Sequence, residues 1–152
     1  MQQKSTTSRI LSLNKPKEIT AENLVIKRGH YFKWYEGSGL AHYWSVLNNE
    51  HDGKFLIANI TSADFGGGKF IDNSCVIAVN QYTFGRISKK SFVNYRGIQL
   101  KTVVELKDII LNDSIFENAR APACMIDLMA GVVAIAPNAL PRFKTYYKSI
   151  GH

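Results

Sequence analysis

Basic and aromatic residues are interleaved in one stretch near the start of the chain. The stretch comprises Lys27, Arg28, Tyr31, Phe32, Lys33, Trp34 and Tyr35, followed by His42, Tyr43 and Trp44. Aromatic rings stack on any base and cationic side chains neutralise phosphates, so this combination favours binding of single-stranded nucleic acid. The alternative is structural, because alternate residues of a strand point inward and about half of these rings would then lie in the core.

The motifs of several large enzyme classes are missing. Gly66-Gly67-Gly68-Lys69 is followed by Phe70, and Ala63 stands five positions before Gly68, so this stretch is not a phosphate-binding P-loop. The chain has no G-x-S-x-G elbow and no H-E-x-x-H motif. Its histidines, at positions 30, 42, 51 and 152, lack ligand spacing with one another or with the cysteines. We therefore expect no metal site and no cofactor.

Length and composition indicate one globular domain. The chain has 152 residues, of which 45% are hydrophobic and 20% charged, enough for a core without a disulfide or metal. Cys75 and Cys124 form no C-x-x-C pair and are expected to be buried thiols in a reducing compartment. No run approaches the roughly 18–20 apolar residues that cross a bilayer, and no signal peptide is evident. We expect a cytoplasmic protein with no membrane contact.

Positive charge is concentrated at the N-terminus. The formal net charge is +7, and residues 1–40 carry seven Lys and Arg against three acidic residues. Such a balance favours polyanionic partners, either nucleic acid or an acidic protein. Residues 1–20 show little periodic hydrophobicity and are predicted to form a flexible basic arm, with residues 21–152 as a single domain.

The pattern of apolar residues predicts strands first and helices afterwards. Short aromatic and β-branched runs at 24–26, 31–35, 42–47, 54–61 and 74–79 indicate strands, and residues 96–100 could close the sheet. Residues 103–111 have helical spacing, and a second helix is bracketed by Pro122 at its start and Gly131 after its end. Residues 132–136 suit a short strand or an extension, and Asn138 could cap a final turn. The prediction is a β-rich α+β fold, with the β part at about 22–101 and the helical part at about 102–150.

Three motifs near the start of the chain form a series. They are KRGHYFKW at 27–34, HYWSVLNN at 42–49 after a Gly-Ser-Gly loop, and FLIANITS at 55–62. This order resembles the opening of the MazF/PemK/CcdB toxin family of toxin–antitoxin systems. The family has a basic-Gly-acid turn into an aromatic strand, an R-P-V-V-V-I-x-N-D-like strand, and then a hydrophobic strand ending in Thr or Ser. The similarity covers roughly residues 25–65 and becomes looser up to about residue 111.

The resemblance implies both a fold and an activity. The fold would be a small SH3-like barrel of the CcdB/PemK type followed by C-terminal helices, usually as a homodimer. In the ribonuclease members, single-stranded RNA is cleaved without metal when the 2′-hydroxyl attacks the adjacent phosphate and leaves a 2′,3′-cyclic end. An acidic antitoxin typically covers the RNA groove.

The resemblance assigns catalytic candidates at a few positions. Thr61 and Ser62 match the strand-end Thr or Ser, which would hydrogen-bond the scissile phosphate or the attacking hydroxyl. Where the family has its catalytic arginine, this chain has Ala41-His42. His42 could act as general base or acid, because the ordinary pKa of histidine is about 6.5, but it lacks the permanent bidentate phosphate contact of arginine. His30 stands where the family has Asp, a further departure.

A second cationic segment could supply the missing positive charge. Residues 86–96 contain four cations, two serines and Tyr95, and the RNA-contact candidates there are Arg86, Ser91 and Arg96, with Lys90 the weaker one. Together with Lys27, Arg28, Lys33, Trp34 and Tyr43 they make up the predicted RNA-binding set. The plainer interpretation is a solvated loop and an edge strand protected by lysines.

Two functions of different class follow. One is a toxin-like endoribonuclease that is neutralised by an acidic antitoxin. The other is a non-catalytic SH3-like module that binds a protein or a nucleic acid, which the missing arginine favours; an adaptor that uses the basic arm is a third possibility. A nuclease requires His42, Thr61 and one of Arg86, Arg96 or Lys90 to meet around one concave basic groove, whereas a binding module does not.

Overall fold

The computed structural model describes residues 18–36, 41–62, 74–77, 87 and 89–150. Along the chain its elements are β1 (His30–Trp34), β2 (His42–Val46), β3 (Lys54–Ser62), β4 (Val76–Ile77), β5 (Ser91–Val93), the 3₁₀ turn η2 (Tyr95–Gly97), β6 (Gln99–Thr102), α2 (Val103–Asn112), β7 (Ser114–Arg120), α3 (Ala123–Val133) and α4 (Pro141–Ser149). This is an α+β fold with an antiparallel sheet. Within the described residues, no helix is long and apolar enough to cross a membrane.

The sheet is built around β3. Its strands follow the order β4-β5-β3-β2-β1-β7, and all their pairings are antiparallel. The first half of β3 pairs with β6, and its last residues pair with β5. β5 and β6 therefore lie along the same side of β3, and η2 connects them. Every residue of β3 except the first and last is buried, as expected of a strand covered on both faces. Among the described strands, β4 and β7 end this order, and β6, which pairs with β3 alone, is a further edge.

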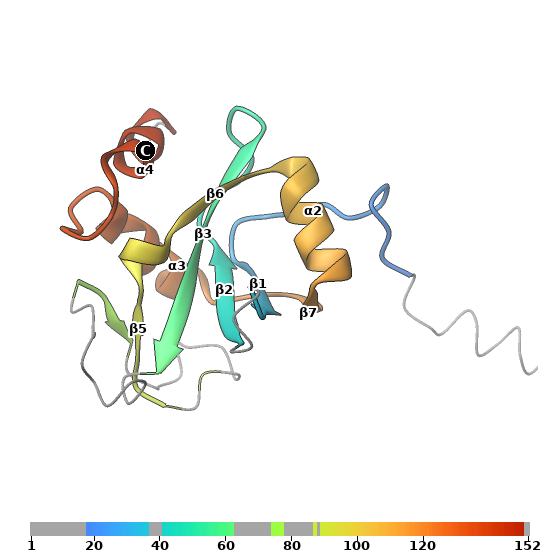
Figure 1. The fold of residues 1–152 in the computed structure, drawn as a ribbon, viewed down its shortest axis with the longest axis horizontal. Helices are drawn as coiled ribbons and strands as arrows, with labels where there is room; N and C mark the ends of the chain where they lie inside the picture. The colour runs from blue at the N-terminus through green and yellow to red at the C-terminus, as the bar shows by residue number, and fades with distance from the viewer. Residues whose placement is uncertain (1–17, 37–40, 63–73, 78–86, 88, 151–152) are drawn as a thin grey trace, which may run out of the picture.

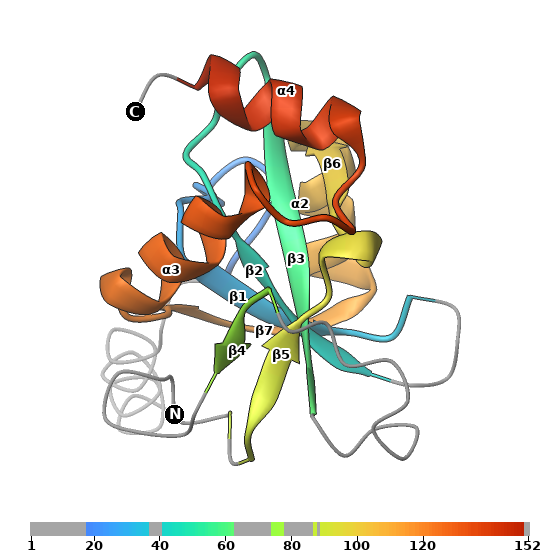
Figure 2. The same cartoon turned by 90° about the vertical axis from the view of Figure 1, so that its left-hand side faces the viewer.

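Helices cover both faces of the sheet (Figures 1 and 2). On one side, which we call the α2 face, Leu106 and Ile110 of α2 pack against Phe32, Val46 and Ile57. On the other side, the α3/α4 face, Met125 and Met129 of α3 and Phe143 of α4 share a cluster with alternate residues of β3. The hydroxyl of Tyr95 donates to the carbonyl oxygen of Met129 at 2.7 Å and so ties η2 to α3. The alternation of side chains along each strand therefore decides which helix a residue meets.

Helix α2 begins at a complete capping box. Glu105 N donates to Thr102 Oγ1 at 3.1 Å, and Thr102 N donates to Glu105 Oε1 at 3.0 Å. The backbone and side-chain bonds from Thr102 lower the pKa of the Glu105 carboxyl, because they favour its charged form. The helix ends at Asn112, one residue beyond the run at 103–111 that predicts it.

Removing the capping hydroxyl should destabilise the domain modestly. We expect Thr102→Ala to lower the free energy of unfolding by about 1 kcal/mol, because the first turn of α2 loses the acceptor for a backbone N–H. Thr102→Ser keeps the hydroxyl and should retain most of that stability. Urea denaturation of both variants measures the difference, and equal loss in the two would show that the box contributes nothing.

Most predicted elements are confirmed, with shifted ends. The strands expected at 31–35, 42–47 and 54–61 are β1, β2 and β3, and residues 96–100 divide between η2 and β6. The strand expected at 74–79 is β4 at Val76–Ile77, and residues 78–79 lie outside the described part. The α3 helix starts after Pro122 but continues through Gly131 to Val133, so the extension of the helix is confirmed and the glycine stop is wrong. Helix α4 is capped at Leu140 rather than Asn138.

Two further predictions are wrong. Residues 24–26 form no strand; Leu24 and Ile26 are buried against the α2 face, so the apolar pattern there reflects anchoring of an irregular segment. Between α2 and α3, where no strand is predicted, β7 pairs with β1. Its seven residues are all exposed or half-buried, which is why it lacks the apolar signature of an interior strand.

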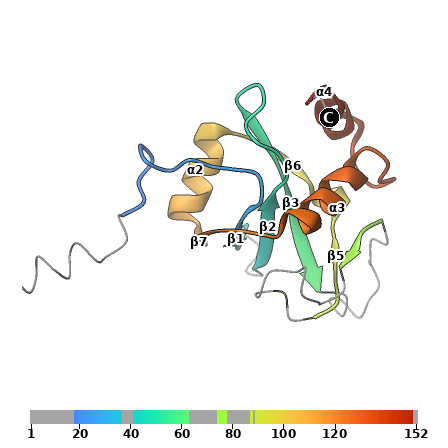
Figure 3. The ribbon, with the colours of Figure 1, turned by 180° about the vertical axis from the view of Figure 1, so that it is seen from behind.

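The segment that enters β1 is held against α2. Residues 1–17 of the predicted basic arm lie outside the described residues, whereas Ile19 packs against the α2-face cluster. Thr20 N donates to Asn23 Oδ1 at 2.7 Å, and Lys107 Nζ of α2 donates to the carbonyl oxygen of Ala21 at 2.7 Å. Seen from behind, the segment runs past α2 before it turns into β1 (Figure 3).

Candidate nucleic-acid interface

Two of the predicted catalytic residues share the α2 face. His42 lies opposite Trp34 in the sheet. It is two residues from the buried Trp44 along β2, so both side chains lie on the α2 face. Thr61 lies two residues from Asn59 and four from Ile57 along β3, so its side chain lies on that same face. The β2–β3 register ends at the pair of Tyr43 with Ile60, and His42 and Thr61 are the next residues of these two strands. The structure thus places on one face of adjacent strands two side chains that are separated along the chain.

His42 is suited to remain uncharged near neutral pH. Burial lowers its pKa below the ordinary value of 6.5, and the Glu36 carboxylate opposes that shift in part. Glu36 itself accepts a hydrogen bond from Gln99 Nε2 at 2.6 Å, which holds this carboxylate beside β6. A neutral imidazole can accept a proton, which is what a general base requires.

Thr61 is less open to a ligand than the sequence suggests. Its side chain is buried, with 4% of the residue exposed, and its hydroxyl donates to Asn59 Oδ1 at 3.0 Å. Asn59 lies against η2: its carbonyl oxygen accepts from Asn94 N at 3.2 Å, and its Nδ2 would lie 3.4 Å from a Cβ added to Gly97. A Cβ at Gly97 would therefore touch Asn59 at ordinary contact distance and would approach Asn94 Nδ2 more closely, at 3.1 Å. The hydroxyl oxygen of Thr61 keeps capacity to accept a hydrogen bond, but its proton is engaged.

Two tryptophans form an aromatic surface beside His42. The ring centroids of Trp34 and Trp44 are 5.2 Å apart, and Lys101 Nζ of β6 lies 5.9 Å from the Trp34 ring centroid. Trp44 is buried, and its Nε1–H has no hydrogen-bond acceptor among the described residues. Trp34 is half-buried, so one part of its ring is supported by Trp44 and another part remains accessible. A ring held in this way, next to a cation, can stack on a base.

Other predicted site residues lie on the α3/α4 face. Ser62 follows Thr61 directly and so points to the opposite face, where its strand register pairs it with Ser91. Ser91 is buried, and its hydroxyl donates to the carbonyl oxygen of Lys89 at 2.8 Å. Lys33 and Tyr43 also lie on this face, with Lys33 Nζ 5.9 Å from the Tyr43 ring centroid. These residues do not share a surface with His42 and Thr61.

The remaining predicted RNA contacts are dispersed. Arg28 is held in place by an ion pair with Asp127 of α3 at 2.8 Å and by a bond from its Nε to the carbonyl oxygen of Leu47. Lys27 precedes β1 at the opposite end of that strand from Trp34. Lys90 and Arg96 are exposed, and Arg96 is the residue before Gly97 in the turn that touches Asn59. Arg86 lies outside the described residues.

Residues that sequence reasoning missed complete this face. They are Asn59, Lys101, Glu36 and Gln99. Asn59 could have been found from its spacing of two from Thr61, because residues i and i+2 of a strand share a face. Lys101 and Gln99 carry no such signal, because only the pairing of β6 with β3 places them on the α2 face.

A second polar cluster, around His51, Tyr146 and Ser149, is structural. The Tyr146 hydroxyl lies 2.8 Å from the carbonyl oxygen of His51 and 2.9 Å from that of Lys54, and it accepts from Asn48 Nδ2 at 3.1 Å. Ser149 Oγ is 3.3 Å from His51 Nε2, but its proton is donated to the carbonyl oxygen of Tyr146 at 2.6 Å. The pair therefore lacks the hydrogen bond from serine to histidine that an activated nucleophile needs. Its bonds fasten α4 to the β2–β3 hairpin.

No family model, curated protein or solved structure matches this chain. Across the described parts of the chain, no group of three or more His, Cys, Asp or Glu side chains could hold a metal ion. The chemistry available around His42 on the α2 face is that of its own side chains: one imidazole, one hydroxyl, one carboxylate, two carboxamides, two indoles and one ammonium group.

Proposed function

We propose that the chain binds single-stranded RNA across the α2 face and cleaves it without metal. The observation that carries this proposal is that His42 and Thr61 follow the last β2–β3 pair on one face of the sheet, beside the Trp34–Trp44 pair, with Lys101 as the nearby cation in place of Arg86, Arg96 or Lys90. The net charge of +7 adds attraction for a polyanion. The SH3-like barrel, the homodimer, the acidic antitoxin and the cytoplasmic location belong to the same proposal, and they rest on the resemblance of residues 25–65 to the toxin family.

The proposed reaction uses the 2′-hydroxyl of the substrate as nucleophile. A base stacks on Trp34, which places the following ribose and phosphate near His42. The His42 imidazole takes the proton of the 2′-hydroxyl as the 2′-oxygen bonds to phosphorus, and the bond from phosphorus to the 5′-oxygen breaks. The departing oxygen takes up a proton from the imidazolium or from water. The products are a 2′,3′-cyclic phosphate and a 5′-hydroxyl, and Lys101 supplies positive charge close by.

A second function, binding without cleavage, is favoured by the state of Thr61. Its hydroxyl proton is already donated to Asn59, and the residue is almost fully buried. A buried, engaged hydroxyl contributes little to a phosphate in the transition state unless the site rearranges. In this alternative the same aromatic surface holds single-stranded RNA or a protein and carries out no chemistry.

One assay separates the two functions. The purified protein is incubated with a long single-stranded RNA in EDTA, and the fragment ends are analysed for 2′,3′-cyclic phosphate. Metal-independent cleavage with cyclic ends supports the nuclease. Intact RNA that is nevertheless retained by the protein in a filter-binding assay supports the binding module, and RNA that is neither cut nor bound contradicts both RNA proposals.

Removal of the exposed indole should weaken RNA binding under either function. We expect Trp34→Ala to raise the Kd for single-stranded RNA by about 5- to 150-fold, the equivalent of roughly 1–3 kcal/mol for one stacked base. Tyr35→Ala is the matched control, because Tyr35 follows β1, is 46% exposed and is not part of the cluster on the α2 face. Fluorescence anisotropy with a labelled oligonucleotide measures both, and equal weakening would contradict a stacking role specific to Trp34.

A further inference from the structure

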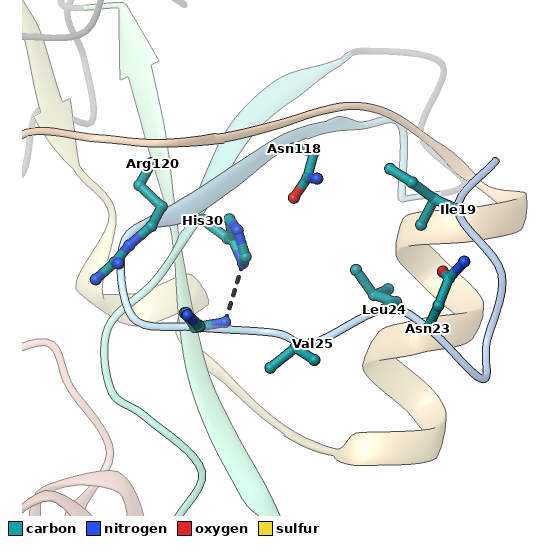
Figure 4. A pocket seen from close by; sticks show the side chains of 8 residues that line it. Ile19, Asn23, Leu24, Val25, His30, Asn118 and Arg120 are labelled. Carbon is teal, nitrogen blue, oxygen red and sulfur yellow. Dashed lines mark hydrogen bonds between the residues drawn. The ribbon is translucent and has the colours of Figure 1, made fainter. Parts of the chain in front are cut away.

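A pocket lies at the other end of β1, away from His42. It has a volume of about 500 Å³, is open to solvent, and is lined by the segment that enters β1, by β1 itself and by β7 (Figure 4). This volume falls within the range of small-molecule sites, about 300–1,000 Å³. The lining residues are Ile19, Asn23, Leu24, Val25, Lys27, His30, Asn118 and Arg120. Its walls differ in character: Ile19, Leu24 and Val25 form an apolar side, and the other residues supply amides, cations and an imidazole.

His30 presents a hydrogen-bond donor in this pocket. Its Nδ1 accepts from the backbone N–H of Lys27 at 2.9 Å, so a neutral ring carries its proton on Nε2. Burial lowers the pKa of His30, and the positive charges of Arg120 and Lys27 lower it further, which keeps the ring neutral. The residue is only 5% exposed, but its Nε2 is not among the fully buried donors that lack a partner in the described residues, which are Trp44 Nε1 and Ser45 Oγ. Nε2–H therefore reaches the surface of the pocket, where a bound acceptor can take the place of water.

The strand β7 is distorted where it borders the pocket. His30 pairs with Arg120 and Phe32 with Phe116, so one residue of β1 faces residues 117–119 of β7. Within this bulge Asn118 has φ of 53°, a left-handed conformation that costs a non-glycine residue about 1 kcal/mol or more. The conformation turns the Asn118 amide toward the pocket (Figure 4). Bulges of this kind often redirect a side chain next to a functional site.

The charge of the lining is positive. Arg120 and Lys27 contribute two cations, and none of the described residues that line the pocket is Asp or Glu. Arg120 Nε donates to the carbonyl oxygen of Arg28 at 2.9 Å, which fixes the guanidinium at the rim of the pocket, on the side away from Asn118 (Figure 4). The nearby Glu22 interacts with Thr20 and Lys107 instead. Cations together with neutral donors, without a carboxylate, suit an anion.

We propose that this pocket binds a phosphate group, with the apolar wall of Ile19, Leu24 and Val25 holding the organic part of the molecule that carries it. The shared chemistry is an oxyanion that accepts from His30 Nε2–H, the Asn118 amide and the two cations. Its source is either a small phosphate ester, such as a nucleoside monophosphate, or a phosphate of RNA bound to the same domain. The proposal does not depend on cleavage at His42.

Calorimetric titration of the full chain tests phosphate binding in this pocket, with inorganic phosphate, AMP and a short single-stranded RNA as separate ligands. We expect saturable binding of AMP that is tighter than that of phosphate. Arg120→Gln and Lys27→Gln should each weaken AMP binding about tenfold or more, because each removes a charged partner of the anion. Lys148→Gln is the control, since it removes the same charge from an exposed site on α4. In an NMR titration, the ring nitrogen signals of His30 should shift on binding, whereas those of His51 should not.

Competition between AMP and RNA identifies the source of the phosphate. If RNA displaces AMP, the phosphate of RNA occupies the pocket; if AMP binds without competition from RNA, the ligand is a small phosphate ester. Absence of saturable binding by all the ligands overturns the proposal. A loss in Lys148→Gln equal to that in Arg120→Gln also overturns it, because it shows general attraction between charges.

Discussion

His42→Ala is expected to reduce RNA cleavage by about 10²- to 10⁴-fold, the usual contribution of a general base. The imidazole is the group on the α2 face able to take the 2′-hydroxyl proton near neutral pH, since burial lowers its pKa and keeps it uncharged. Single-turnover cleavage of a labelled RNA measures the loss. RNA binding should persist in this variant, because the Trp34–Trp44 pair is left in place.

The pH dependence gives a second test of the same role. A general base works in its neutral form, so the cleavage rate of the wild-type protein should be level near pH 7 and fall as the pH drops through the lowered pKa of His42. That fall should lie below 6.5, the ordinary value for histidine. In His42→Ala the acidic limb should disappear from the residual rate. His51→Ala is the control, since His51 lies beside Ser149 of α4 and not on the α2 face. Loss of activity in both variants, or an unchanged pH profile, would contradict the assignment.

Leu106→Ala should produce the largest loss of stability among the single substitutions considered. Leu106 is fully buried, with 0% exposure, and it packs α2 against the α2 face of the sheet. Truncation removes apolar contacts and leaves a cavity, at a cost of about 2–5 kcal/mol. The free energy of unfolding, measured by urea denaturation, should fall by that amount.

Val104 offers a control on the same helix. It is 78% exposed, so Val104→Ala should change the free energy of unfolding by less than about 0.5 kcal/mol. Comparable losses in the two variants would mean that α2 contributes through its helical propensity rather than through the packing of Leu106. A small effect of Leu106→Ala alone would mean that the sheet keeps its core without α2.

The strands that contain His42 and Thr61 could be predicted because their local patterns of apolar and β-branched residues are strong. In β3 a run of apolar and β-branched residues follows a turn, which indicates a buried strand whatever the rest of the chain does. The segment at 24–26 has a similar pattern but no strand beside it, so its apolar residues anchor an irregular segment. In β7 the pattern is weak, because an edge strand with exposed side chains needs little apolar content. The local pattern of apolar residues therefore predicts burial better than it predicts pairing between strands.

The sequence by itself determined most of the strands and helices, with residues 24–26 and β7 as the exceptions, and the faces that residues share within one strand. Both follow from the short repeat of backbone geometry, which relates residues a few positions apart. Only the tertiary structure decided that the strands of His42 and Thr61 are neighbours, that Lys101 lies over Trp34, and that Asn118 and Arg120 line one pocket with His30. These relations depend on the register between strands and on the bulge in β7. Register is set by the packing of the whole sheet, and no pattern within a single strand records it.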